Sequence, residues 1–238
     1  MMAPRPRSSR GSGEQLRGEI IDAAMVLLAE HDSADAVSVR AVAEAVGVTP
    51  PAIYLHFADK EALLDSVCGR YFERLDVALG DAEDQHEHPL DRTLAMGMTY
   101  VRFALDNPAV YRFAFGNPGD DGTPMVDEAL QTTAFGRLAG AVGSLVDLGW
   151  FPPGPPGHDD VSVLQMAMQM WTVAHGVASL MIAKPALPWG DDLQVAESVL
   201  RAACLGNALL PAVGEKADGA DFVAFVRDTR AAHREHAE

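Results

Sequence analysis

Cysteine is scarce in this sequence. Its 238 residues include two cysteines, Cys68 and Cys204, which lie far apart and form no metal or redox spacing. A reducing cytoplasm is therefore the simplest setting. The first residues are polar and rich in arginine, without an apolar run behind them, so no signal peptide is expected.

Basic residues are also few, because 18 Lys and Arg stand against 34 Asp and Glu, for a formal net charge of -16. This charge argues against DNA binding by the molecule as a whole. Its distribution matters more than its sum, since Arg5, Arg7, Arg10 and Arg17 face only Glu14 in the first 17 residues. We expect residues 1–13 to form a disordered basic arm that can bind phosphates, on a body that discourages unspecific binding.

Charged residues are absent from positions 161–183, which are long enough to cross a membrane. Polar residues nevertheless recur in this segment every three or four positions and form one stripe: Ser162, Gln165, Gln169, Thr172, Gly176 and Ser179. The spacing favours a long soluble helix with most of its surface buried over a membrane span.

Strand alternation and internal repeats are missing as well, so the fold class is all-α. Helical periodicity and turn residues predict helices near residues 15–30, 38–47, 49–58, 59–79, 89–107, 108–115, 125–148, 159–183, 191–210 and 220–236. Loops rich in Gly and Pro are expected at residues 116–124 and 151–157.

A pair of short helices stands out in the segment SVRAVAEAVGVTPPAIYLHFADK, residues 38–60. Ser38 is a good N-cap for the first helix, which Gly47 ends. Thr49 caps the second, where Pro50 and Pro51 are tolerated because amides in a first turn have no helical partner. Two helices joined by such a tight turn form a helix-turn-helix, although short helix pairs are also common in all-α proteins that bind no DNA.

The run VRAVAEAVGVTPPAIYLHFADKEALL closely resembles the signature of the TetR family of bacterial regulators, in a match that covers residues 14–64. The resemblance implies an Ω-shaped, all-helical homodimer with nine or ten helices per chain. Residues 14–60 would be the DNA-binding domain of a transcriptional repressor that recognises an operator. Residues 61–238 would bind a small effector and dimerise through the last long helices.

The resemblance also implies which residues face DNA. Ser38 and Lys60 match positions that meet phosphates, Arg40 lies at a DNA-facing position, and Tyr54 and His56 match an aromatic pair that contacts the DNA backbone. The complete set of predicted DNA-binding residues is Ser38, Arg40, Thr49, Pro50, Pro51, Ala52, Tyr54, Leu55, His56 and Lys60.

The base-reading positions depart from many relatives, because Pro50, Ala52 and Leu55 offer no side-chain hydrogen bonds to base edges. Specificity would then rest on Arg40, Thr49 and the shape of the DNA.

Each of these residues has a plainer interpretation. Tyr54 could cover the core, His56 could be an ordinary surface histidine, and Lys60 could be a solvated side chain. Thr49 is a cap whether or not it touches DNA. Phe57 matches an aromatic that packs inside the family's DNA-binding domain, so a structural role is implied for it.

The run WTVAHG resembles a C-terminal subgroup of the same family that is named for its Trp-His-Gly signature. Trp171 and His175 are four residues apart and share a helix face, so the histidine could anchor a polar ligand atom. A buried histidine bonded to the backbone is the alternative. The predicted ligand-binding residues are Met98, Phe103, Tyr111, Phe115, Met168, Trp171 and His175.

Ordinary core packing would explain most of these side chains equally well. Few charges fall in the helices concerned, so the predicted effector is mostly apolar and uncharged. No cofactor, metal or catalytic motif is predicted, because His86 and His88 lack a third ligand and no nucleophile signature is present. An activator or repressor controlled by a protein partner remains the alternative function.

Overall fold

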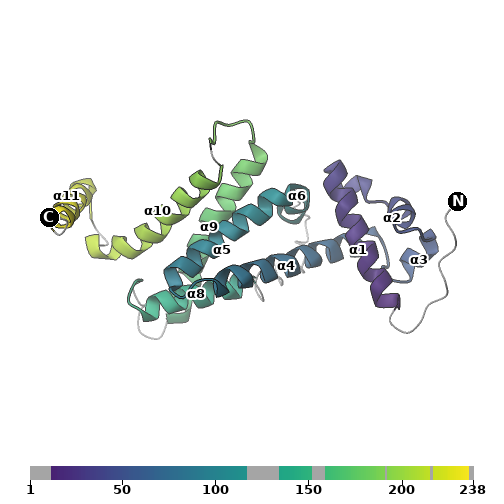
Figure 1. The fold of residues 1–238 in the computed structure, drawn as a ribbon, viewed down its shortest axis with the longest axis horizontal. Coiled ribbons are helices and arrows are strands. Elements are labelled where there is room, and N and C mark those ends of the chain that lie inside the picture. The colour runs from purple at the N-terminus through teal and green to yellow at the C-terminus, as the bar shows by residue number, and fades with distance from the viewer. Residues whose placement is uncertain (1–11, 117–133, 152–158, 191, 215–216, 236–238) are drawn as a thin grey trace. The chain divides into compact units, whose positions relative to one another are not determined.

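The computed structural model describes residues 12–116, 134–151, 159–190, 192–214 and 217–235. Within these ranges the chain forms ten α-helices and one short 3-10 helix, and no strand (Figure 1). The predicted all-α fold is therefore confirmed. The arm at residues 1–11, the loop at 117–124 and the early part of the helix expected from residue 125 lie outside the described residues.

The chain divides into two compact units. Unit 1 comprises Met1–Asp81 and Arg102–Arg137, and unit 2 comprises Ala82–Val101 and Leu138–Glu238. The helix-turn-helix segment lies wholly within unit 1, and the uncharged stretch lies wholly within unit 2.

Unit 1 starts with α1 (Ser12–His31), whose buried face carries Ile20, Ile21, Ala24 and Leu28. This face repeats every three or four residues, as the sequence predicted, and α1 packs against α2 (Val39–Val46) and α6 (Pro108–Gly116). The short η1 (Ala34–Ala36) connects α1 to α2, and α3 (Pro50–Tyr54) follows α2 directly.

Helix α4 (Lys60–Asp84) runs five residues past the predicted end near Leu79. Gly80, the first residue beyond the predicted end, is helical, and a Cβ there would lie 3.1 Å from the Arg137 guanidinium. Arg137 Nε in turn donates to Asp76 Oδ1 at 2.7 Å. A glycine lets this arginine lie close to the helix backbone, so Gly80 marks a close approach and not a helix end.

Helices α5 (Pro89–Asp106) and α6 both begin at a proline, as predicted from the tolerance of the first turn for a residue without an amide hydrogen. Helix α8 (Phe135–Asp147) begins in unit 1 and continues into unit 2. It precedes α9 (Asp159–Ala183), whose bounds match the sequence prediction. Helix α10 (Asp192–Val213) packs against α9, and α11 (Gly219–Glu235) ends the described chain.

Helix α9 is long and apolar enough over Ser162–Ala183 to cross a membrane by length and composition. Only 28% of its apolar window is buried inside the chain. The sequence predicted a mostly buried helix, and within one copy of the chain this expectation is wrong. The single chain therefore leaves much of the apolar surface of α9 exposed to solvent, which is unusual for a stable globular protein.

Candidate functional site

The turn between α2 and α3 is built from the residues that the sequence indicated. The Ser38 Oγ accepts a hydrogen bond from the Ala41 amide at 3.1 Å and so caps α2. Gly47 has φ 76°, ψ 35°, a left-handed conformation that a side chain disfavours, and its amide ends the helix. The Val48 amide then donates to the Ala43 carbonyl at 2.9 Å, which closes the turn.

Thr49 occupies the N-cap position of α3 but makes no side-chain cap bond, contrary to the prediction. A capping hydroxyl accepts from the second or third amide of the helix. Pro51 has no amide hydrogen, and the Ala52 amide donates to the Thr49 carbonyl at 2.9 Å instead. The exposed Thr49 hydroxyl is therefore not used by the cap.

Helix α3 presents apolar side chains to solvent. The Tyr54 side chain is 57% exposed and Leu55 is 84% exposed, whereas Ile53 and Phe57 are buried at 1% and 4%. The interpretation of Tyr54 as a core residue is therefore wrong, and the structural role implied for Phe57 agrees with its burial. Adjacent exposed apolar residues on a short helix are typical of an interaction surface.

The other predicted DNA-facing residues also lie at the surface. Ser38, Arg40, Pro50 and Pro51 are exposed, and Ala52, His56 and Lys60 are half-buried. The Lys60 ammonium lies 3.8 Å from a carboxylate oxygen of the fully exposed Asp35, a long contact that water can replace. Lys60 opens α4 beside Asp59, whose carboxylate accepts from the Ala62 amide at 2.8 Å.

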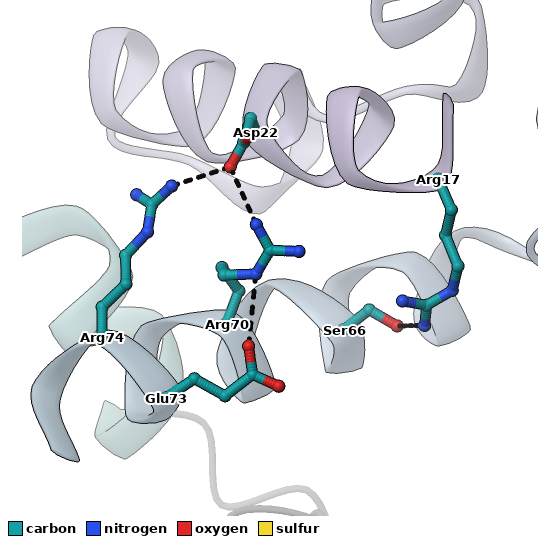
Figure 2. A network of polar contacts seen from close by, with 6 residues as sticks. All are labelled: Arg17, Asp22, Ser66, Arg70, Glu73 and Arg74. Carbon is teal, nitrogen blue, oxygen red and sulfur yellow. Dashed lines mark hydrogen bonds and ion pairs between the residues drawn. The ribbon is translucent and has the colours of Figure 1, made fainter. Parts of the chain in front are cut away.

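Arg17 was counted with the basic arm, and the structure corrects this. Its guanidinium carbon lies 5.1 Å from the centroid of the buried Phe57 ring, and its Nη2 donates to Ser66 Oγ at 3.2 Å. Arg17 of α1 thus contacts Ser66 of α4 (Figure 2) and also packs on Phe57, just after α3. The sequence could have indicated this role, because Arg17 lies four residues before the buried Ile21 and so near the same face of the helix.

A second polar contact joins α1 to α4 (Figure 2). The Asp22 carboxylate on α1 accepts from Arg74 Nη2 at 2.8 Å and from Arg70 Nη1 at 3.4 Å. Arg70 Nε also lies 3.3 Å from Glu73 Oε2, which orients its guanidinium. One carboxylate of α1 therefore contacts two residues of α4 that are one helical turn apart.

The end of α1 is held by a different helix. Arg112 of α6 pairs with Asp32, with its Nε at 3.1 Å from Asp32 Oδ1. Asp32 has φ 50°, a conformation that aspartate tolerates better than most residues. Asp22 thus ties the middle of α1 to α4, and Asp32 ties the end of α1 to α6. A movement of α4 or α6 would therefore be transmitted to α1, which packs against α2 of the helix-turn-helix.

Asp22→Ala should lower the free energy of unfolding by about 0.5–1 kcal/mol, because two half-exposed arginines lose their shared partner. Urea denaturation followed by circular dichroism measures the change, and added salt should reduce it. Asp228→Ala is the control, since its pair with Arg227 is 70% exposed and joins adjacent residues of one helix. Equal losses for the two variants would show that the Asp22 contacts contribute nothing specific.

Three of the predicted ligand-binding residues belong to an aromatic cluster in unit 1. The ring centroids of Phe103 and Tyr71 lie 5.0 Å apart, those of Phe115 and Phe72 lie 5.8 Å apart, and those of Tyr111 and Phe115 lie 4.9 Å apart. Burial raises the pKa of the Tyr71 hydroxyl. These contacts are those of a packed core, and a ligand contact for the three residues stays a prediction.

The remaining candidates lie in unit 2. Met98 is buried and Met168 is 46% exposed. The rings of Trp171 and His175 lie 5.1 Å apart at an interplanar angle of 41°. The His175 Nδ1 is 2.9 Å from the Tyr100 hydroxyl, so this ring nitrogen is paired with a side chain.

Burial lowers the pKa of His175, which keeps the ring neutral near pH 7. Sequence reasoning missed Tyr100. Tyr100 lies four residues after the buried Met96 on the same face of α5, so its hydroxyl could be expected to be buried and to need a hydrogen-bond partner. No sequence pattern could identify His175 as that partner.

Both cysteines are buried, and burial raises the pKa of the Cys68 thiol to about 12. Burial also raises the pKa of Cys204. Since the thiolate is the reactive form, neither residue has the environment of a redox sensor.

Two family models match the chain. The model described as bacterial regulatory proteins of the tetR family matches residues 20–67, which contain α2 and α3. The model described as a tetracyclin repressor-like C-terminal domain matches residues 93–203.

Curated relatives share part of this sequence. The HTH-type transcriptional repressor KstR2 of Mycobacterium tuberculosis is 30% identical over 88 residues, which are 37% of this chain and 44% of the repressor. The uncharacterized HTH-type transcriptional regulator YobS of Bacillus subtilis is 26% identical over 111 residues, which are 47% of this chain and 57% of that protein. The chain thus spans about half the length of the curated relatives it matches.

Solved structures share the fold over most of the chain. A protein of unknown function from Rhodococcus sp. RHA1 has a TM-score of 0.71 at 27% identity and covers 87% of this chain and 100% of its own. The regulator FadR from Bacillus subtilis, solved in complex with stearoyl-CoA, has a TM-score of 0.66 at 16% identity, covering 79% and 98%. RolR, solved with resorcinol, has a TM-score of 0.59 at 18% identity, covering 84% and 96%.

Proposed function

The chain belongs to the TetR family of bacterial regulators, and we propose that it is a cytoplasmic transcriptional repressor which binds a near-palindromic operator as a dimer and is released by a small uncharged effector. The observation that carries the proposal is the outer face of α3. This face exposes Tyr54, Leu55 and the Thr49 hydroxyl to solvent. It belongs to the helix-turn-helix that the family model matches.

In this proposal α3 enters the major groove and the residues around it contact the backbone. Tyr54, His56 and Lys60 meet phosphates, while Ser38 and Arg40 do so from the start of α2. The exposed Leu55 contacts thymine methyl groups, and Thr49 supplies the hydroxyl that its cap position leaves available. The arm at residues 1–13 adds phosphate contacts of its own.

The dimer is proposed from the exposed sides of α9 and α10. Leu164, Met168 and Leu180 on α9 are each nearly half exposed, and no charged residue lies between positions 161 and 183. On α10, Leu205 and Leu209 are similarly exposed. A second copy of the chain would cover both helices in a four-helix bundle, which explains why α9 is apolar enough to pass for a membrane span.

The effector is proposed to bind in residues 61–238. FadR and RolR, which share the fold, were solved with stearoyl-CoA and resorcinol, so this fold accommodates ligands of different sizes. For this chain we propose an apolar, uncharged effector, on the scarcity of charges in α9 and on the resemblance of WTVAHG to the Trp-His-Gly subgroup.

Release would follow from a shift between two conformations. The contacts of α1 with α4 at Asp22 and with α6 at Asp32 are the proposed route, since they hold the middle and the end of α1. A ligand that prefers another placement of these helices weakens operator binding, and by linkage operator DNA must weaken ligand binding by the same factor.

Tyr54→Ala and His56→Ala test the DNA-binding proposal. Each should weaken binding to every operator variant by a similar factor of about five to twenty, because a backbone contact carries no base preference. Gel shifts on a series of operator variants measure this, with Val77→Ala on α4 as an exposed apolar control. A changed order of preference among the variants would contradict the assignment as backbone contacts.

A further inference from the structure

Trp171 on α9 has a hydrogen-bond donor without an acceptor. Its indole Nε1 is buried, and no partner lies within reach among the described residues. Folded proteins leave few buried donors unsatisfied, because such a group has lost its water and gained nothing in exchange. A buried donor without a partner among the described residues suggests that its acceptor is another group, such as a bound ligand.

The other described indoles show that this chain can satisfy a tryptophan. Trp189 is near the surface, yet its Nε1 donates to the Lys184 carbonyl at 2.9 Å. The Trp150 ring lies against His88 and remains 39% exposed, so water can reach it. Trp171 has neither a backbone acceptor nor access to solvent for its nitrogen.

Two other polar side chains, His175 and Tyr100, lie near the unpaired Trp171 indole N–H. The His175 ring lies one helical turn further along α9, with its centroid 5.1 Å from the Trp171 ring. Tyr100 approaches from α5 and bonds His175 Nδ1 at 2.9 Å, which fixes the imidazole in place. The side chains that α9 buries near them carry no charge, since they are Met170, Ala174 and Ala178.

We propose that Trp171, His175 and Tyr100 form the polar end of the effector site, and that the effector is an uncharged molecule whose carbonyl oxygen accepts the Trp171 Nε1–H. Tyr100 acts by orienting His175, and Trp171 is the direct contact. This inference rests on the proposed function as a ligand-responsive regulator and names the ligand chemistry of that site.

The charge pattern selects a neutral acceptor over an anion. A carboxylate would accept the same hydrogen bond, but it would also lose its water beside a helix without lysine or arginine from position 161 to 183. A ketone, ester or amide oxygen offers the acceptor without that cost. A hydrocarbon offers no acceptor and leaves the indole unsatisfied.

The test uses the full chain labelled with ¹⁵N at its three tryptophans, each of which gives one indole N–H signal. Trp171→Phe assigns the signal by removing it while the variant keeps an aromatic ring. The probes are the neutral ketones 2-butanone, acetophenone and 2-undecanone, with ethylbenzene as a hydrocarbon match for acetophenone and benzoate as an anionic match.

We expect at least one ketone to move the Trp171 signal downfield at millimolar concentration, while the Trp189 signal stays in place because its bond to Lys184 persists. Ethylbenzene and benzoate should leave the Trp171 signal unmoved. The Trp171→Phe variant should bind the active ketone about five- to tenfold more weakly, as expected for one lost hydrogen bond in a buried site.

The inference is overturned if no ketone moves the Trp171 signal, or if benzoate moves it more than acetophenone does. It is also overturned if a long-lived water, seen through its cross-relaxation with the indole proton, stays in place in saturating ketone. None of these measurements involves DNA. If the chain binds no operator, the proposed function as a DNA-binding regulator is wrong. A shift of the Trp171 indole signal on ketone binding would still support the ligand site.

Discussion

Gly176→Arg is expected to convert the proposed dimer into a monomer of 25.4 kDa that no longer binds operator DNA. Gly176 lies on the exposed side of α9, and a Cβ there meets no atom within 4 Å in the single chain. The arginine therefore has room in the monomer, so folding should be preserved.

In the proposed dimer the same position lies in the uncharged interface. Burying an unpaired guanidinium costs several kcal/mol, so the dimer should be weakened at least about a hundredfold. One recognition helix cannot engage two half-sites, and operator binding should fall with dimerisation. Analytical ultracentrifugation at micromolar concentration and a gel shift on the same preparation measure both effects.

Gly140→Arg is the matched control, because Gly140 is also an exposed helical glycine with open space beyond it, on α8. This variant should remain a dimer with unchanged operator affinity. A Gly176→Arg chain that stays dimeric would show that α9 is not the dimer interface. A monomeric chain that keeps full affinity for a two-site operator would contradict the requirement for a dimer.

Gly47→Val should lower the free energy of unfolding by about 1–3 kcal/mol, near the upper end because a β-branched side chain tolerates φ 76° poorly. The strain falls on the turn that sets α3 relative to α2, so operator affinity should fall more than tenfold. Thermal unfolding and a gel shift below the transition temperature measure the two losses separately.

Gly47→Asn is the matched variant at the same position. Asparagine enters the left-handed region at much lower cost, so it should recover most of the stability and most of the operator affinity. If valine and asparagine are equally harmful, the left-handed backbone of Gly47 is not what the turn requires. Some other property of the glycine, such as close approach of DNA, would then have to explain the loss.

The helix-turn-helix could be predicted from sequence because its determinants are local. Ser38 and Gly47 act on amides and carbonyls within four residues of themselves, so their chemistry is readable in a linear string. Thr49 was read correctly as the position of a cap, yet its hydroxyl makes no cap bond because Pro51 removes the amide it would have used. That correction was also available from the sequence.

The end of α4 was decided by tertiary structure. Gly80 looks like a helix stop when only its own propensity is considered. The helix nevertheless continues through Gly80, and the Arg137 guanidinium, far along the chain, lies where a side chain at position 80 would otherwise be.

Sequence by itself determined the all-α class, the bounds of α9 and the helix-turn-helix, because periodicity and caps act over a few residues. Only the tertiary structure paired Tyr100 with His175 and buried the Trp171 nitrogen away from every acceptor in the part of the chain that it describes. It alone also placed Arg17 on Phe57 and two arginines of α4 on Asp22. A side-chain hydrogen bond between distant residues depends on how helices pack, and packing joins positions that no local period relates.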